Sequence, residues 1–244
     1  MLLPGTALRE TILITGAAGR VATMISPTVR SVFRLRRLDL RTAQVEGDDE
    51  VITADLCEFD LAARACDGVR AVVHLAAQPA EAEFRARLLP RNIDATWAVF
   101  QAATRAKVPR FVFASTIQTI SGYPQGARVP ANAAPRPVSA YACTKLFGEA
   151  LGRFHADTSG LGVACLRIGA VRVAGDPSLA DEQTQGLWCG ADDLARLIVA
   201  AIYSTVPFAL VTAVSPPATD RFDTTNPFGW EPSDQPNQPA GLRV

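Results

Sequence analysis

Short apolar segments alternate with helical patterns along the first two thirds of the chain. Six runs are predicted to be strands, over residues 11–15, 32–38, 51–53, 71–75, 111–114 and 163–168. The clearest helical patterns between them cover 92–107 and 139–158. Such alternation predicts an α/β fold built on a doubly wound parallel sheet.

The pattern weakens after Gly169. A helix is predicted over 191–202 and a short strand over 208–212. Residues 215–244 are rich in Pro, Asp, Thr and Asn, so we expect them to be loop-like or partly disordered. We therefore expect a single structural unit, with a core over 1–169 and a small C-terminal lobe over 170–244.

Charge and cysteine usage narrow the class of protein. Lys plus Arg equals Asp plus Glu, at 24 each, which argues against nucleic acid or an anionic membrane as a partner. No apolar run approaches the roughly 18–20 residues that span a bilayer. The five cysteines are scattered, which favours free thiols in the cytoplasm over disulfides or a metal site.

A glycine-containing turn directly follows the first predicted strand. Its sequence is Gly16-Ala17-Ala18-Gly19-Arg20-Val21-Ala22, and it opens a predicted helix. Glycines at such a turn let the backbone approach a pyrophosphate, whose charge is favoured by free N–H groups at a helix N-terminus. We therefore predict a dinucleotide site here, with contacts from Gly16, Ala18, Gly19, Arg20 and Val21.

Asp39 ends the second predicted strand, about 20 residues after the turn. A carboxylate there accepts hydrogen bonds from the adenosine ribose and repels a 2′-phosphate. This favours NAD as the cofactor, although Arg36, Arg37 and Arg41 lie nearby and keep NADP as an alternative.

Tyr141 and Lys145 lie four residues apart in a predicted helix, so both can face one pocket. A free phenol titrates near pH ~10, and a neighbouring cation is expected to lower that pKa toward values useful for proton transfer. The spacing alone is common, and an exposed helical pair is the simpler interpretation unless other residues support a site.

Several ordered motifs support one. The chain resembles the extended short-chain dehydrogenase/reductase family, which includes nucleotide-sugar epimerases. The resemblance rests on Gly16 to Ala22, Asp55-Leu56, His74-Leu75-Ala76-Ala77, Asn92 to Thr96, Ser115-Thr116, Tyr141 to Lys145 and Gly229-Trp230-Glu231-Pro232. It implies a Rossmann fold, NAD as cofactor and a homodimer formed by paired helices.

The resemblance also implies roles for individual residues. Tyr141 takes the substrate hydroxyl proton as a hydride leaves for the nicotinamide, Lys145 lowers the pKa of Tyr141, and Thr116 donates to the reacting oxygen, with Ser115 as second choice. Further cofactor contacts are expected from Asp39, Asp55, Leu56, Leu75, Ala76, Ala77, Asn92, Ser115 and Ile168. Outside this set, we expect His74 to be structural, His155 to lie on a helix surface, and Asp192-Asp193 to cap the following helix.

Within that family the chain is most similar to uronate dehydrogenases, with one departure. Those enzymes carry an Asn-His pair after the catalytic Ser, where this chain has Ile117-Gln118, and their uronate-binding Arg is replaced near Gln183. Arg172 remains as an alternative anchor for an anion. The expected substrate contacts are Gln78, Thr116, Ile117, Gln118, Gly169 and Arg172.

Three activities follow from this resemblance. Dehydration is disfavoured because Ile117-Gln118 cannot titrate. Epimerases use the same catalytic residues but need a larger C-terminal lobe, and only about 75 residues follow Gly169. The leading hypothesis is an NAD-dependent oxidoreductase acting on a carbinol of a small sugar or sugar acid. An epimerase and a non-catalytic dinucleotide sensor are the alternatives.

Overall fold

A computed structural model describes residues 9–236 of the 244-residue chain. A seven-stranded parallel sheet runs through its centre, in the order β3-β2-β1-β4-β5-β6-β9. The strands are β1 Thr11–Thr15, β2 Arg34–Asp39, β3 Glu50–Thr53, β4 Ala71–His74, β5 Arg110–Thr116, β6 Gly162–Ile168 and β9 Phe208–Ala213. The predicted doubly wound Rossmann sheet is therefore confirmed.

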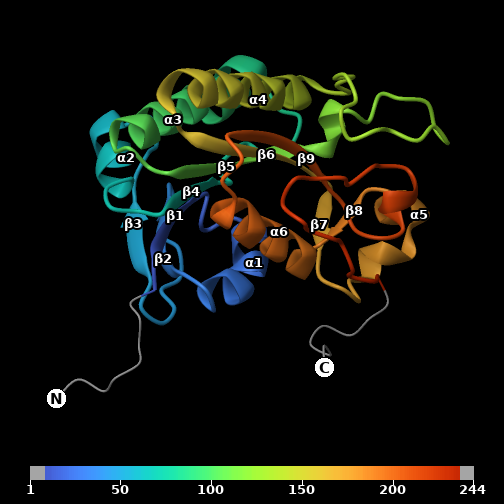
Figure 1. Ribbon diagram of the computed structural model, residues 1–244, viewed down its shortest axis with the longest axis horizontal. Coiled ribbons are helices and arrows are strands. Elements are labelled where there is room, and N and C mark those ends of the chain that lie inside the picture. Colours follow the sequence, from blue (N-terminus) through green and yellow to red (C-terminus); the bar gives the residue numbers. More distant parts are fainter. Residues whose placement is uncertain (1–8, 237–244) are drawn as a thin grey trace.

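Helices cover both faces of this sheet (Figure 1). On one face lie α1 (Arg20–Arg30) and α6 (Ala191–Tyr203), and on the other α2 (Phe59–Ala65), α3 (Ala95–Arg105) and α4 (Ala140–Ser159). Apolar strand residues alternate between the two hydrophobic clusters, so each face has its own core. The strand order reverses between β1 and β4, and in doubly wound sheets the ligand crevice lies at such a point, outside the carboxyl ends of the strands.

Two local features set the position of α4, the helix that carries Tyr141 and Lys145. Ser139 caps its first turn by accepting a hydrogen bond from the backbone N–H of Ala142 at 3.0 Å. Gly160 ends it in the left-handed conformation, with φ at +73°. Gly148, inside the helix, lies directly on the ring of Phe113, and a side chain there would hold α4 away from β5.

The helix predicted over 92–107 differs from the observed one. A π-helix, Phe84–Asp94, precedes α3 and is continuous with it. Its first turn is capped by Glu83, whose carboxylate accepts from the backbone N–H groups of Arg85 and Ala86. Pro90 lies inside this segment and cannot donate to a helical hydrogen bond. The sequence around Pro90 is polar and lacks the apolar spacing of an amphipathic helix, so this segment was not predicted to be helical.

The predicted boundary at Gly169 does not separate the sheet from the lobe. Both β9 and α6 follow Gly169, yet β9 pairs with β6 and α6 packs against α1. The smaller part consists of the two-stranded sheet of β7 (Ala170–Arg172) and β8 (Trp188–Gly190), helix α5 (Glu182–Gln185), and an irregular segment after β9. It lies beside one end of the main sheet (Figure 1).

The irregular segment is loop-like as predicted, but its described part is packed. Phe222 and Trp230 are both buried, and Trp230 donates from its indole N–H to the Asp193 carbonyl at 3.0 Å. These two buried aromatic side chains hold the segment in place, although its polar composition favours a loop that is partly disordered. Residues 237–244, which belong to the same expected loop, lie outside the described residues.

Two expectations outside the site are wrong. Asp193 does not cap its own helix: its buried carboxylate accepts from the backbone N–H groups of Ser233 and Asp234, each at 2.9 Å, and so holds the C-terminal segment. His155 is not a surface residue. It is 3% exposed, stacks on Phe100 and bonds to Thr104 between α3 and α4.

Candidate active site

The glycine turn forms a backbone cradle at the crevice. Gly16 has φ at +71°, and a Cβ built on it would lie 2.6 Å from the backbone nitrogen of Ala76, directly after β4. No side chain caps the N-terminus of α1, which begins at Arg20. The first N–H groups of α1, including those of Arg20 and Val21, therefore have no side-chain cap, and a dinucleotide pyrophosphate would fit this arrangement.

Asp39 lies beside this cradle. Its carboxylate accepts from the backbone N–H of Ala18 at 3.0 Å and from that of Arg41 at 2.9 Å. The side chain is mostly buried, at 11% exposure, and is fixed at the edge of the glycine turn. A carboxylate has about four acceptor positions, so capacity remains for ribose hydroxyls.

Asn92 joins the predicted cofactor loop to the catalytic helix. Its side chain is buried in the π-helix, accepts from the backbone N–H of Gln78 at 2.7 Å, and donates to the hydroxyl of Thr144 at 2.9 Å. The side chain of Asn92 therefore links this segment to α4. The half-buried segment that it holds is Leu75, Ala76, Ala77 and Gln78.

Two further predicted cofactor contacts, Asp55 and Leu56, follow the end of β3. Leu56 is buried in the sheet core, whereas Asp55 accepts from the backbone N–H of Cys57 at 2.9 Å. Asp55 thus shapes its own turn in this structure.

Tyr141, Lys145 and Thr116, the residues predicted to be catalytic, come together as a buried trio. The hydroxyls of Tyr141 and Thr116 are hydrogen-bonded, and Lys145 Nζ lies 5.8 Å from the centroid of the Tyr141 ring. Nζ also lies 5.0 Å from the Phe113 ring centroid. Each member is at most 8% exposed. The three side chains are contributed by α4 and by the carboxyl end of β5.

The electrostatics of the trio differ from expectation. Burial raises the pKa of Tyr141 to about 12, although its hydrogen bond with Thr116 acts in the opposite direction. Burial also lowers the pKa of Lys145 to about 7. The pKa of Tyr141 is therefore raised, not lowered as predicted, because burial penalises the charged phenolate.

Ser115 lies apart from this trio. Its hydroxyl donates to Glu149 Oε1 at 2.6 Å, and Glu149 forms a buried ion pair with Arg167 at 2.8 Å. Successive side chains of a strand point to opposite faces, so Ser115 and Thr116 cannot share one environment. Thr116 is the hydroxyl placed for chemistry.

The predicted substrate residues fall into two groups. Ile117 is buried, and the amide oxygen of Gln118 accepts from the hydroxyl of Ser139 at 2.7 Å, so both lie between β5 and the start of α4. Arg172 is held within the small lobe: it donates to Ser178 Oγ at 3.2 Å and lies 4.0 Å from Asp176. Ile168 and Gly169 connect the two, at the end of β6.

One contact was missed by sequence reasoning. Glu81 Oε2 accepts from the backbone N–H of Tyr141 itself at 3.2 Å, in the first turn of α4. A carboxylate is favoured there by the helix dipole. Glu81 lies 60 positions away from Tyr141 in the sequence, and no local motif surrounds it.

His74 is structural, as expected. Its ring is fully buried and bonded through both nitrogens, to Thr15 at 2.7 Å and Thr96 at 3.2 Å. Burial, together with the charge of Lys145, lowers the pKa of His74 to about 3, so the ring is neutral at physiological pH.

Neither a membrane-spanning helix nor a metal-binding cluster is found among residues 9–236. Within that range no helix has the length and apolar character needed to cross a membrane. Among the same residues, no group of three or more His, Cys, Asp or Glu side chains is placed to hold a metal ion.

A parallel doubly wound sheet, a glycine cradle and a buried Tyr-Lys-Thr trio define a nicotinamide-dependent oxidoreductase. Comparison with known proteins agrees: the model of the NAD dependent epimerase/dehydratase family matches residues 12–184. The chain belongs to this family, and NAD is its cofactor. The resemblance to extended short-chain dehydrogenases/reductases is thereby confirmed.

Individual relatives are sugar dehydrogenases. The chain is 32% identical over 196 residues to a uronate dehydrogenase of Pseudomonas syringae, covering 79% of this chain and 70% of that one. It is 31% identical over 247 residues to an L-arabinose 1-dehydrogenase (NAD(P)(+)) of Haloferax volcanii, covering 91% and 96%. The crystal structure of uronate dehydrogenase from Agrobacterium tumefaciens is similar, with a TM-score of 0.84, 28% identity, and coverage of 93% and 86%.

Proposed function

We propose that this protein is an NAD-dependent dehydrogenase that oxidises a carbinol of a small sugar or sugar-acid derivative. The observation that carries the proposal is the buried trio of Tyr141, Lys145 and Thr116 at the carboxyl end of β5. The named activities of the relatives, on uronates and L-arabinose, support a substrate of this size. The glycine cradle on the same edge of the sheet would hold the cofactor.

The chemistry requires two transfers from one carbinol. A hydride leaves its carbon, the hydroxyl proton leaves its oxygen, and a carbonyl forms. When NAD is bound, it supplies the acceptor for the hydride. Tyr141 takes that proton at its phenol oxygen as its own hydroxyl proton leaves toward Lys145, and Thr116 holds the reacting oxygen by a hydrogen bond. If the carbinol is C1 of a cyclic sugar, the product is a lactone.

Lys145 can pass the proton onward. The pKa of Tyr141, about 12, keeps the phenol protonated at neutral pH, so oxidation needs a second group that can accept the proton. Lys145, with a pKa of about 7, exists in both protonation states near neutrality. Its Nζ lies close to the Tyr141 ring and inside the same buried site.

The expected substrate contacts are Gln78, Thr116, Ile117, Gln118, Gly169 and Arg172. Of these, Gln118 is held through its side-chain amide oxygen, which accepts from Ser139, and its amide N–H groups remain for hydroxyl recognition, whereas Gln78 is held through its backbone N–H, which donates to Asn92. Arg172 remains a candidate anion anchor, although Ser178 and Asp176 compete for its guanidinium.

A panel of substrates tests this proposal. Purified protein with NAD is mixed with neutral aldoses, uronates and sugar phosphates, and NADH is followed near ~340 nm. We expect turnover with at least one neutral aldose or uronate. Binding of NAD without turnover on any sugar would favour the dinucleotide sensor, and sugar conversion without net NADH would favour the epimerase.

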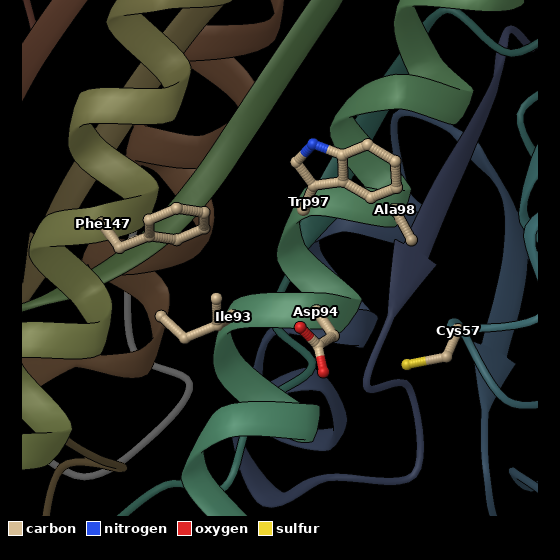
Figure 2. Close-up of a pocket in the computed structure, with 6 residues that line it drawn as sticks. All are labelled: Cys57, Ile93, Asp94, Trp97, Ala98 and Phe147. Carbon is tan, nitrogen blue, oxygen red and sulfur yellow. The ribbon is translucent and has the colours of Figure 1, made fainter.

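We also propose a homodimer formed through α3 and α4. Trp97 of α3 and Phe154 of α4 are 50% and 54% exposed, which is high for such large apolar side chains. Figure 2 shows an apolar hollow on this side, where Trp97 and Ile93 from one helix and Phe147 from the next line its wall. The hollow does not include the catalytic trio.

Trp97→Glu is expected to convert the dimer to a monomer, because it places a charge in the centre of the apolar face. Light scattering after gel filtration gives the mass. Val45→Glu serves as the matched control, since Val45 is 66% exposed in the loop after β2. A wild-type protein that is monomeric at all concentrations would contradict the proposed dimer.

We place the protein in the cytoplasm. All five cysteines are free thiols, and Cys66, Cys165 and Cys189 are buried. A reducing compartment keeps such thiols from pairing.

A further inference from the structure

A carboxylate from outside α4 holds the backbone of Tyr141. The N–H of Tyr141 lies in the first turn of this helix, where it has no acceptor within the helix itself. Glu81 Oε2 accepts from it at 3.2 Å, and within residues 9–236 this is the one hydrogen bond that the Glu81 side chain makes. Because Glu81 is exposed, water competes for the same N–H group. The contact therefore holds Tyr141 only as firmly as Glu81 itself is held.

The carbonyl of Tyr141 is held as well, through a chain of hydrogen bonds. The hydroxyl of Thr144 donates to this carbonyl at 2.7 Å, and Asn92 donates to that hydroxyl at 2.9 Å. Asn92 also accepts from the backbone N–H of Gln78 at 2.7 Å and donates to the carbonyl of Gln78 at 3.2 Å. Both polar groups of the Tyr141 backbone are thus connected to one short segment, residues 75–81.

The same segment lies against the glycine cradle. The N–H of Leu75 donates to the carbonyl of Thr15, the last residue of β1, at 3.1 Å. Gly16 approaches Ala76 so closely that a Cβ would lie 2.6 Å from the Ala76 nitrogen. Residues 75–78 are half-buried, and residues 79–81 are exposed. The segment therefore begins at the predicted pyrophosphate site and ends at the catalytic helix.

Neither helix that borders this segment needs Glu81 in order to begin. The π-helix is capped by Glu83, whose carboxylate accepts from the backbone N–H groups of Arg85 and Ala86. Helix α4 is capped by Ser139. What the Glu81 contact adds is a direct bond between the end of the segment and the residue that carries the phenol.

We propose that Glu81 is a positioning residue, through which NAD bound against residues 75–78 fixes the backbone of Tyr141. The inference rests on the proposed function, because it takes the dinucleotide to lie in the glycine cradle and Tyr141 to move the proton. Glu81 acts only through Tyr141: once the segment is restrained, Glu81 restrains the first turn of α4 and so the place of the phenol oxygen beside Thr116. Small displacements of a proton-transfer group cost large factors in rate.

Amide hydrogen exchange of the full chain, resolved by NMR for the single N–H groups of residues 139–145, tests the proposal without turnover. In the wild type, the Tyr141 N–H is expected to exchange about tenfold more slowly with saturating NAD than without it. Glu81→Ala should speed this exchange about tenfold and remove most of the effect of NAD. The N–H of Ala142, which is bonded to Ser139, should exchange as in the wild type.

Kinetics with an active sugar give a second readout. Glu81→Ala is expected to lower kcat about tenfold while KM for the sugar and the dissociation constant for NAD change less than about twofold, because the phenol is displaced and binding is not. Glu81→Gln keeps an acceptor oxygen and should restore most of kcat and most of the protection of the Tyr141 N–H. A merely structural role would not separate kcat from KM in this way.

Glu58→Ala is the matched control. Glu58 precedes α2, is exposed, and makes no side-chain hydrogen bond to that helix. Loss of the same charge there should leave both the exchange rates and kcat unchanged.

The possible failures are distinct. An unchanged exchange rate of the Tyr141 N–H in Glu81→Ala, or equal wild-type rates with and without NAD, would overturn the role of Glu81. A kcat of Glu81→Ala within about twofold of a wild type that oxidises sugar would do so as well, and would leave the proposed function intact. A wild type that binds NAD but oxidises no sugar would overturn both.

Discussion

Tyr141→Phe is expected to lower kcat for sugar oxidation on the order of 10³-fold while the dissociation constant for NAD changes less than about twofold. The ring remains in its buried place on α4, and only the oxygen that carries the proton is removed. The hydrogen bond between Tyr141 and Thr116 is lost as well, whereas Thr116 keeps the hydroxyl that holds the reacting oxygen. Steady-state kinetics and calorimetric titration with NAD measure the two quantities.

Tyr203→Phe is the matched control for this change. Tyr203 ends α6 and is 52% exposed, so the same loss of a hydroxyl should not affect turnover. If Tyr141→Phe kept more than about a tenth of the wild-type kcat, proton transfer by Tyr141 would be wrong.

Lys145→Met is expected to abolish most activity and yet to stabilise the protein at neutral and acid pH. Burial lowers the pKa of Lys145 from 10.5 to about 7. Between those values the unfolded chain binds the proton and the folded chain does not, so the free energy of unfolding rises with pH. Below about 7 the folded protein carries a buried charge at its full cost. Methionine has a similar length and removes that cost.

The size of this effect is bounded. At about 1.4 kcal/mol per tenfold change, the lowered pKa of Lys145 corresponds to at most about 5 kcal/mol near pH 6, and the difference between variant and wild type should vanish above about pH 10. Urea unfolding between pH 6 and 10 measures it. Lys107→Met is the control, because Lys107 is an exposed lysine just after α3. Equal stability of wild type and Lys145→Met across that range would show that Lys145 is not held as a buried amine.

The sequence predicted the sheet and the trio because both depend on local patterns. Each of the strands predicted up to residue 168 is present, and Tyr141 and Lys145 are brought to one site by the helical spacing that identified them. Thr116 was distinguished from Ser115 by the resemblance, and the structure gives the reason: Ser115 is bonded to Glu149.

The remaining features depend on contacts between distant residues. Glu81 reaches Tyr141 across 60 positions, and Asp193 reaches Ser233 across 40. Neither contact leaves a periodic or motif-based pattern. The sequence does not distinguish Arg37, in β2, from Arg41, just after it. Arg37 is nevertheless buried and Arg41 exposed, because the packing of the loop after β2 decides which side chain is covered. The pKa of Tyr141 was misjudged because burial cannot be read from spacing.

The most direct test of the account is whether NADH accumulates as sugar is consumed. Wild-type protein is incubated with excess NAD and an active sugar from the panel, and absorbance near ~340 nm is compared with the sugar product measured in the same sample. We predict about one NADH formed for each sugar oxidised, with product formation lost in Tyr141→Phe. Conversion of the sugar with no net NADH would contradict the account and identify the reaction as an epimerisation.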